Sequence, residues 1–443
     1  MKSLYKTSCT LVLLTFLTLS CSKEKTKSVN NFGAYISGTI SENYTNDIFL
    51  RNSTSFLDTL NISESGEFLK KFNVLLPDIY FLSIAQDNYP IFIDKNDSLN
   101  ITLNLSEYEN ATVFKGKGSE KNNFYLKLLQ LINEDKNPCE TLFNKKYTDF
   151  KTSADSLRDL RRAFYLRKKT EIGWNTSFDK IAQTTLDYAY YAILERYEIT
   201  HKQTNPQDSI PKKHYDFRAK TDITKNEFIV IKPYTNYIVS LIDNIAFKQK
   251  NNTISNHFKI ADSLLQNGTL KNEISFQIAK NFIDATEKAD VVEKVKTNFM
   301  KVNSDKFYQG KIRNLIDHFL KNKSTIKLTN YNYTDINNNP YNIWNQNNTA
   351  IVFFWSKFYK NNYIQQLHKI DSILKQNSNY HFYAINLDGV TSWTDSIAKN
   401  NLPITYLKSL TPYKMKRDLQ VNYKKMMLID DNTFIKNTNY QVK

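Results

Sequence analysis

Cysteine is the residue type that would carry redox or nucleophilic chemistry most directly, and this chain of 443 residues contains three. Cys9 and Cys21 lie within the first 21 residues, so Cys139 is the one thiol further along the chain. One thiol cannot close an intramolecular disulfide or supply a C-x-x-C pair. Cys139 follows Pro138 between two expected helices, where we expect a buried thiol or one free to pair with another molecule.

Other reactive residue types do not assemble into a recognisable site. The chain has six histidines, with neither H-x-H nor H-E-x-x-H spacing, so no metal site is predicted. They are His201, His214, His257, His318, His368 and His381. Asp94 with Asp97, and Asp430 with Asp431, could act as paired carboxylates. Both pairs flank expected turns, however, and aspartate is a common turn former.

Two glycines near the end of the first segment raise the possibility of a phosphate-binding loop. Gly116 and Gly118 lie in "KGKGSEKN", but the Walker spacing is absent and Ser119 fits the N-cap of a following helix. A turn is therefore the expected structure. Neither a G-x-S-x-G motif nor a dinucleotide fingerprint is present, so we expect no cofactor.

The first 21 residues, MKSLYKTSCTLVLLTFLTLSC, concern location. Lys2 and Lys6 precede an apolar run that is too short to stay as a transmembrane helix, which is typical of a signal peptide. The ending LTLSC resembles a bacterial lipobox, in which Cys21 would be lipidated and become the mature N-terminus, although Thr18 stands where leucine is usual. Residues 22–32 form a polar spacer. We therefore expect a lipid-anchored cell-envelope protein, with an ordinary cleaved signal as the alternative.

The charge balance is strongly basic, with a formal net charge of +16 and a pI near 9.3. Such a charge could attract acidic partners, but the basic residues are scattered along the chain, which favours a solvated surface. The longest basic run, Arg158–Lys169, predicts one amphipathic helix with Leu160, Phe164 and Leu166 available for burial. No nucleic-acid-binding signature accompanies it, so no nucleic-acid partner is expected.

Three segments of different periodicity must position any site, and together they predict a multi-domain α+β protein. In residues 33–118 apolar residues alternate with polar ones in short segments, which predicts an antiparallel β-domain. Residues 119–323 show apolar spacings of three and four and predict an all-helical region. Its stripe of Tyr188, Tyr191, Leu194 and Tyr197 is expected to belong to the core.

Residues 324–443 combine buried strands with helices. Ala350–Trp355 predicts a strand covered on both faces, followed by a polar turn and an amphipathic helix. His381–Asn386 lies in a second buried strand, Ser392–Asn401 is expected to form a short helix, and Lys425–Asn437 a hairpin. This β-α-β-α-β-β order predicts a small α/β sandwich with a central parallel pair.

The stretch FFWSKFYKNN resembles the thioredoxin superfamily, specifically the TlpA- or ResA-type thiol-disulfide oxidoreductases of the bacterial cell envelope. In that family a strand ending in Phe-Trp precedes a turn with Cys-x-x-Cys and then a helix. Here Tyr359 and Asn362 occupy the two cysteine positions. The family's cis-proline, just before a strand ending in Leu-Ile-Asp, is replaced by Lys424 or Lys425. The β-domain, helical and C-terminal order is also similar to a lipoprotein architecture of the Bacteroidota.

The resemblance implies a thioredoxin-like fold without its chemistry. Disulfide exchange needs a thiolate and a second, resolving thiol, which tyrosine and asparagine cannot supply. We therefore expect a redox-inactive domain that binds a protein or peptide partner in the superfamily's peptide groove, lined here by Trp355, Lys357, Phe358 and Tyr359. The alternative is an enzyme-associated role, as the partner of a cysteine-bearing paralogue or as a disulfide donor through Cys139. A purely structural role is a third option.

Overall fold

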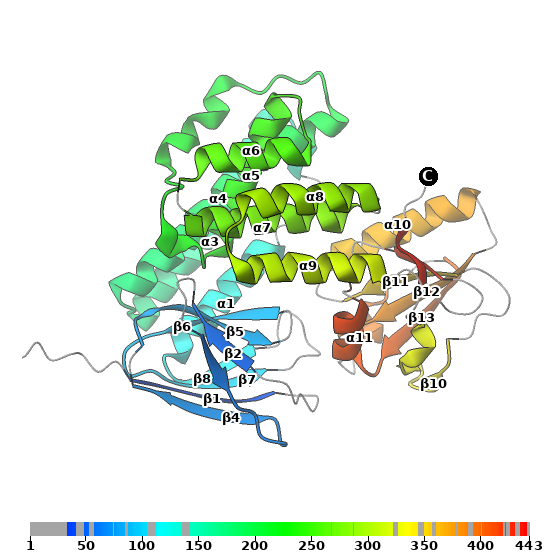
Figure 1. Ribbon diagram of the computed structural model, residues 1–443, viewed down its shortest axis with the longest axis horizontal. Helices are drawn as coiled ribbons and strands as arrows, with labels where there is room; N and C mark the ends of the chain where they lie inside the picture. The colour runs from blue at the N-terminus through cyan, green and yellow to red at the C-terminus, as the bar shows by residue number, and fades with distance from the viewer. Residues whose placement is uncertain are drawn as a thin grey trace, which may run out of the picture.

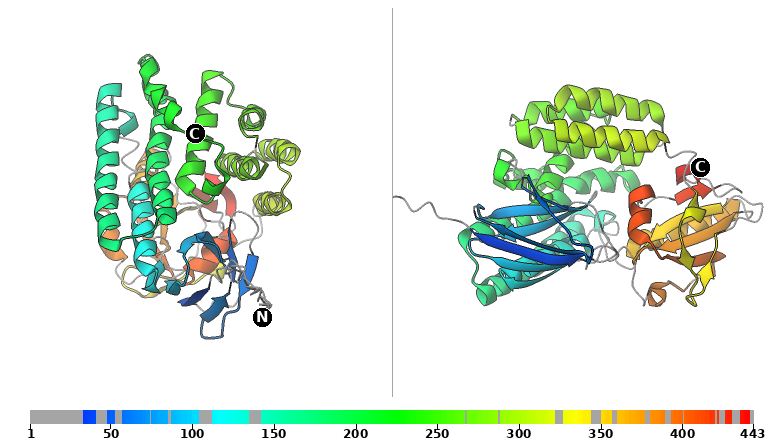
Figure 2. Two further views of the ribbon diagram at one scale, coloured as in Figure 1. Left: turned by 90° about the vertical axis from the view of Figure 1, so that its left-hand side faces the viewer. Right: turned by 60° about the horizontal axis from the view of Figure 1, so that its bottom comes forward.

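The protein combines β-sheets and α-helices in several domains, as a computed structural model shows (Figure 1). Figure 2 shows the β-sandwich beside the C-terminal α/β unit, with helices lying over both. The residues described are 33–40, 48–52, 57–73, 75–84, 87–103, 112–134, 142–266, 268–286, 288–321, 327–343, 350–356, 360–376, 380–388, 393–399, 401–419, 421, 426–429 and 435–440.

The N-terminal domain is a sandwich of two four-stranded sheets, ordered β4-β1-β7-β8 and β3-β2-β5-β6. Its strands are β1 (Ala34–Ile40), β2 (Ile48–Arg51), β3 (Leu57–Leu60), β4 (Glu67–Phe72), β5 (Asp78–Ile84), β6 (Asp87–Ile93), β7 (Ser98–Leu103) and β8 (Thr112–Lys117). The prediction of a purely antiparallel domain is wrong in one place, because β1 pairs with β7 in parallel. Alternation of apolar and polar residues reports which face is buried and carries no information about strand direction.

The sheet β3-β2-β5-β6 contacts the helices with part of its outer face, at β5 and β6. Tyr80 and Leu82 of β5 point into the sandwich core, whereas Ile79 belongs to the core that the helices form. Phe92 of β6 also belongs to the helical core, where its ring meets that of Phe178 edge to face with centroids 5.0 Å apart. The β-domain and the helices are therefore joined by a continuous apolar contact, and the sheet β4-β1-β7-β8 turns its outer face away from the helices.

The middle of the chain is helical, as predicted. Its α-helices are α1 (Ser119–Glu134), α3 (Tyr147–Ile172), α4 (Thr176–Thr204), α5 (Lys232–Lys248), α6 (Ile254–Leu264), α7 (Gly268–Ala285), α8 (Ala289–Val302) and α9 (Lys306–Lys321), and Lys212–Lys220 and Asn226–Phe228 are 3₁₀ helices. The aromatic stripe on α4 lies in the core, where Tyr197 stacks on Phe150 at 3.7 Å between centroids. No helix among the described residues is long and apolar enough to cross a membrane.

The basic segment Arg158–Lys169 lies within α3, but its burial differs from the prediction. Leu160 and Leu166 are 66% and 50% exposed, and Phe164 alone of the three expected residues packs partly against the core. The buried positions of this segment are Arg161 and Tyr165. A helix buries one stripe, and here the packing partners select a face that the apolar residues alone do not identify.

The C-terminal unit is built on one seven-stranded sheet, ordered β10-β9-β13-β12-β11-β14-β15. Its elements are β9 (Tyr333–Thr334), β10 (Pro340–Tyr341), β11 (Ala350–Trp355), α10 (Lys360–Gln376), β12 (His381–Asn386), β13 (Ile404–Ser409), α11 (Pro412–Leu419), β14 (Met426–Ile429) and β15 (Ile435–Tyr440), with a 3₁₀ turn at Leu328–Asn330. β11 and β12 are parallel, and β14 and β15 form the antiparallel pair of the predicted hairpin.

Two local predictions for this unit are wrong. The central parallel pair is a parallel triplet, because β13 joins β12 in parallel. The helix expected over Ser392–Asn401 is, in its described part, a single 3₁₀ turn at Thr394–Ser396. In both cases tertiary contacts override a short local pattern. At the second site the side chain of Trp393 is fully buried in the core.

Candidate functional site

The strand β11 is the element on which the candidate site is built. All six of its residues are buried, and it lies between β12 on one side and β14 on the other. Val352 and Phe354 belong to one apolar cluster, while Ile351, Phe353 and Trp355 belong to the cluster on the opposite face. This confirms the prediction of a strand that is covered on both faces.

Trp355, at the carboxyl end of β11, packs beneath the start of the following helix. Its ring stacks on Tyr363 of α10 at 4.6 Å between centroids and lies 6.0 Å from Trp393. We expected Trp355 to line a binding groove, but its side chain is 1% exposed. The side chain of Trp355 therefore packs between the sheet and α10 and does not line a groove.

The hydroxyl of Tyr363 links three elements. It donates to the Tyr406 hydroxyl of β13 at 3.1 Å and accepts from the Ala398 backbone N–H at 3.2 Å. Burial raises the pKa of Tyr363, so this phenol stays protonated and is not a nucleophile at neutral pH. Tyr363 therefore positions the helix start rather than performing chemistry.

Buried polar groups lie at the carboxyl ends of β11 and β12, two of the three parallel strands. Ser356 comes directly after β11, and Asn386 ends β12 opposite Trp355. The Asn386 side chain donates to the Asp388 carboxylate at 3.0 Å and accepts from the Asp388 backbone N–H at 3.0 Å. The carboxyl ends of parallel strands are where α/β sheets bind ligands. This edge is thus the candidate binding site.

Two indole N–H groups lie at the same edge. The Nε1 atoms of Trp355 and Trp393 are buried, and neither has a hydrogen-bond acceptor among the described residues. A buried donor without an acceptor is rare, because it carries the cost of leaving water without compensation. A hydrogen-bond acceptor placed at this edge could therefore pair with one of the two indole N–H groups.

Asn362, the residue predicted to stand at the second cysteine position of the motif, is described, and most of the other predicted site residues are not. Asn362 is the third residue of α10 and is half-buried, as a helix-start residue beside a covered strand. Its carboxamide supplies no thiol. The remaining predicted positions lie outside the described residues: Cys21, Cys139, Lys357, Phe358, Tyr359, Lys424 and Lys425.

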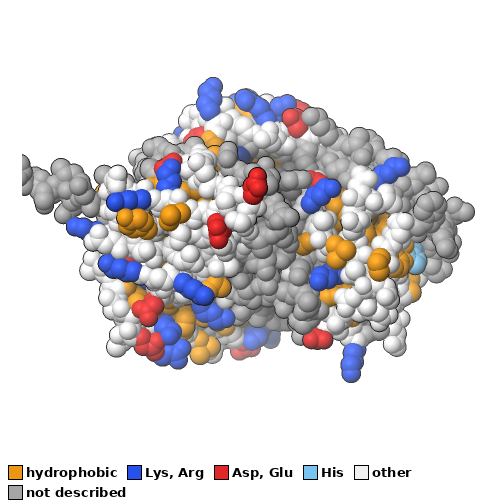
Figure 3. Space-filling view, turned by 90° about the horizontal axis from the view of Figure 1, so that it is seen from below, with side chains coloured by type: hydrophobic (Ala, Val, Ile, Leu, Met, Phe, Trp, Pro, Cys, Tyr) orange, Lys and Arg blue, Asp and Glu red, His pale blue; other side chains and the backbone are white. Residues whose placement is uncertain are grey.

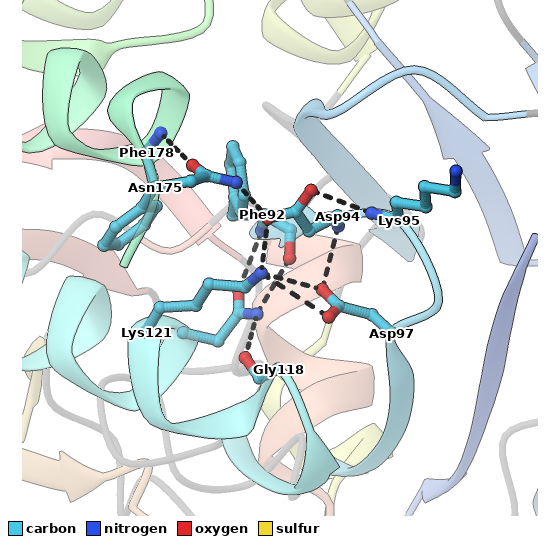
Figure 4. Close-up of polar contacts among 9 residues, drawn as sticks. Phe92, Asp94, Lys95, Asp97, Gly118, Lys121, Asn175 and Phe178 are labelled. Carbon is cyan, nitrogen blue, oxygen red and sulfur yellow. Dashed lines mark hydrogen bonds and ion pairs between the residues drawn. The ribbon is translucent and has the colours of Figure 1, made fainter. Parts of the chain in front are cut away.

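Asp94 and Asp97 lie together on either side of a lysine side chain (Figure 4). The Lys121 ammonium of α1 lies 3.1 Å from a carboxylate oxygen of each. The Asp94 N–H donates to Asp97 at 2.8 Å, and the Asn175 side chain donates to Asp94. Burial raises the pKa of Asp97, and Lys121 opposes that rise. These carboxylates tie the β-domain to α1 and α4.

The three fully or nearly buried histidines of the helical region have structural partners. His201 and His214 contact the backbone carbonyls of Phe143 and Leu194 at 2.8 and 2.9 Å, and His257 contacts Thr253 at 2.9 Å. Within the described part of the chain, no group of three or more His, Cys, Asp or Glu side chains could hold a metal ion.

Sequence reasoning missed Asn386, Asp388, Trp393 and Tyr406. A usable signal existed for the first two, because "INLD" places polar residues directly after a buried strand. Trp393 and Tyr406 had no comparable signal, since the first follows a short polar segment and the second lies in a strand with half-buried residues.

No family model and no curated protein matches this chain. Among solved structures, it is similar to a crystal structure of a Bacteroides vulgatus protein that is described as a thiol-disulfide oxidoreductase. The two share 15% sequence identity with a TM-score of 0.21, over 25% of this chain and 81% of that chain.

Proposed function

We propose that residues 324–443 form a redox-inactive thioredoxin-like domain that binds an extended segment of a protein partner, in a chain anchored to the cell envelope by lipid at Cys21. One observation carries the proposal. β14 begins at Met426, which pairs with Phe353 near the end of β11. The carboxyl end of β11, after which α10 follows in sequence, therefore lies beside the start of the strand that leads into Leu-Ile-Asp, as the resemblance to the superfamily implies.

The chemistry of that edge favours binding over catalysis. Asn362 stands at a former cysteine position, and a carboxamide cannot form the thiolate that disulfide exchange requires. Phe358 and Tyr359 would offer aromatic surface, and Lys357 a positive charge, to a peptide. Aromatic residues are among the side chains that most often dominate binding energy at protein interfaces.

Insulin reduction tests the redox half of the proposal. The chain from residue 22 onward should show no activity above background with dithiothreitol. The variant with Tyr359→Cys and Asn362→Cys should form an intramolecular disulfide, because i and i+3 side chains are neighbours at a helix start. It should still reduce insulin poorly, since Lys424 and Lys425 stand where the family has its proline. Robust activity of the unmodified chain would support the enzyme alternative.

Peptide binding tests the other half. Fluorescence anisotropy against a panel of extended peptides should identify a binder, and Phe358→Ala with Tyr359→Ala should weaken it by roughly ten-fold or more, the effect of losing one interface hot spot. The exposed His368→Ala on α10 is the matched control and should bind as the parent does. Equal affinity for both variants would reject this groove.

Lipidation at Cys21 is tested separately in cells. Cys21→Ser should release the protein from membranes or leave an unprocessed precursor. Normal processing with unchanged membrane association would show that the anchor lies elsewhere.

A further inference from the structure

The outer face of the sheet β4-β1-β7-β8 presents an ordered array of side chains to solvent. The strand registers place Lys71, Tyr35, Ser98 and Lys117 side by side in one row across the four strands. The next row, two residues further along β1, consists of Leu69, Ser37, Asn100 and Lys115. Neighbouring strands lie about 4.8 Å apart, so the residues of one row are close neighbours.

The three lysines of this face lack a carboxylate partner among the described residues. Lys71, Lys115 and Lys117 form no ion pair there, and Lys71 lies instead over the Tyr35 ring, with its Nζ 5.5 Å from the centroid. By contrast, Lys70, which neighbours Lys71 but faces the other way, is paired with Asp58. Lysines in adjacent rows give the face a positive potential, because none of the three is paired with a carboxylate of a described residue.

Among the described strand residues, one carboxylate shares this face, at the far end of β4. Glu67 lies opposite Thr39 of β1 and accepts a hydrogen bond from Ser65 at 3.3 Å. Glu67 and Lys71 are four residues apart on β4, a distance of about 13 Å along the strand. This distance is longer than the Debye length at physiological salt, about 8 Å. The lysine rows are therefore screened from it.

Apolar side chains lie among the lysines. Tyr35 is 46% and Leu69 is 74% exposed, and the residues between them, Ser37 and Asn100, are small and polar. Figure 3 looks at the underside of the molecule, where blue Lys and Arg side chains are interspersed with hydrophobic and some acidic ones over the β-sandwich at the left. Lysine with exposed tyrosine and leucine is the composition of surfaces that settle into the headgroup region of a bilayer.

The position of the face in the chain identifies what it would meet. Tyr35 is the second residue of β1, so the face begins where residues 22–33 end. That segment spans at most about 40 Å when extended, and it contains Lys23, Lys25 and Lys27. A lipid at Cys21 would hold the face within this distance of the bilayer surface.

We propose that the outer face of β4-β1-β7-β8 docks on anionic phospholipid headgroups. Lys71, Lys115 and Lys117 contact the headgroup phosphates, and Tyr35 and Leu69 insert at the level of the glycerol backbone. The inference rests on the membrane attachment proposed above. It adds an orientation, with the β-sandwich against the bilayer and the C-terminal sheet edge free to meet a partner.

Vesicle flotation of the chain from residue 22 onward tests this without the lipid. The chain should float with phosphatidylcholine vesicles containing phosphatidylglycerol and stay behind with phosphatidylcholine alone. In about 1 M salt, where the Debye length falls to about 3 Å, binding should be lost. The triple variant Lys71→Thr, Lys115→Thr, Lys117→Thr should bind roughly 100-fold more weakly, at roughly five-fold per lysine near an anionic surface.

A charge-matched control separates this face from net charge. The variant Lys213→Thr, Lys259→Thr, Lys301→Thr removes three exposed lysines from the helical region and should keep most of the binding. A second readout locates the contact, because the indole introduced by Tyr35→Trp should be quenched by brominated lipid in anionic vesicles. The proposal is overturned if both triple variants lose binding equally, if the introduced indole is not quenched, or if the parent binds an acidic polysaccharide but no vesicle. None of these results would bear on Cys21 processing or on peptide binding.

Discussion

The indole ring of Trp355 lies flat against the phenol ring of Tyr363, with centroids 4.6 Å apart and an angle of 23° between the planes. Trp355 closes β11 and Tyr363 lies in the first turns of α10, so this contact sets how the helix leaves the sheet. The Tyr363 hydroxyl then reaches Tyr406 and Ala398. One side chain thus fixes three elements around the candidate site.

Substitutions at Tyr363 should separate packing from hydrogen bonding. Tyr363→Phe keeps the stacked ring and should lower the free energy of unfolding by about 1 kcal/mol, the usual net value of a hydrogen bond. Tyr363→Ala leaves a cavity and should cost about 4 kcal/mol. The measurement is guanidinium unfolding followed by tryptophan fluorescence, with the exposed His368→Ala as control. If Tyr363→Ala unfolds like the control, α10 is not held by this contact.

Lys121 should be essential to the joint between the β-domain and the helices. Lys121→Met leaves the carboxylates of Asp94 and Asp97 without their cation and should cost about 3 kcal/mol near neutral pH. The exposed Lys259→Met on α6 is the control and should change stability by less than about 0.5 kcal/mol.

The loss at Lys121 should shrink in acid. Burial raises the pKa of Asp97, and removing Lys121 raises that pKa further, so the folded variant binds a proton that the unfolded chain has already released. Unfolding free energies of Lys121→Met and its parent, compared across acid pH, should therefore converge. A gap that widens on acidification would contradict this role.

Gly118 and Gly310 should respond to alanine in opposite directions. Gly118 has φ +92°, and a Cβ there would lie 2.5 Å from the Asp97 carboxyl carbon, so Gly118→Ala should destabilise by more than about 1 kcal/mol. Gly310 lies inside α9, and a Cβ added there would meet nothing within 4 Å, so Gly310→Ala should stabilise by about 1 kcal/mol. Thermal unfolding of the two variants measures whether Gly118→Ala lowers and Gly310→Ala raises the stability. Equal changes in stability would show that backbone strain at Gly118 does not determine the effect of its substitution.

His214 should make the helical region sensitive to mild acid. Burial lowers the pKa of His214 from 6.5 to about 4. Its contribution to stability is therefore fully present above pH 6.5 and is lost as the pH falls towards 4, because the unfolded chain takes up a proton that the folded chain refuses. The full loss is on the order of 3 kcal/mol. The variant His214→Gln should show a flatter profile of urea midpoint against pH, and an unchanged slope would mean that another group controls it.

Periodicity and composition were sufficient for the order of elements. The alternating segments of residues 33–118, the helical spacings of residues 119–323 and the apolar run Ala350–Trp355 all depend on side chains close in sequence. The lack of a thiol at Asn362 is likewise a matter of residue identity. These features need no tertiary information, because local burial patterns and chemical identity already specify them.

Contacts between distant residues decided the rest. The parallel pairing of β1 with β7, the addition of β13 to the central strands and the closure of Asp94 and Asp97 on Lys121 each join segments whose local sequence is compatible with other partners. Trp355 shows the same limit at one residue: the sequence places it at the end of a strand, but α10 and Trp393 decide that its ring is buried. Whether a side chain at a strand end is buried depends on the elements that pack over it, and those elements come together only in the folded chain.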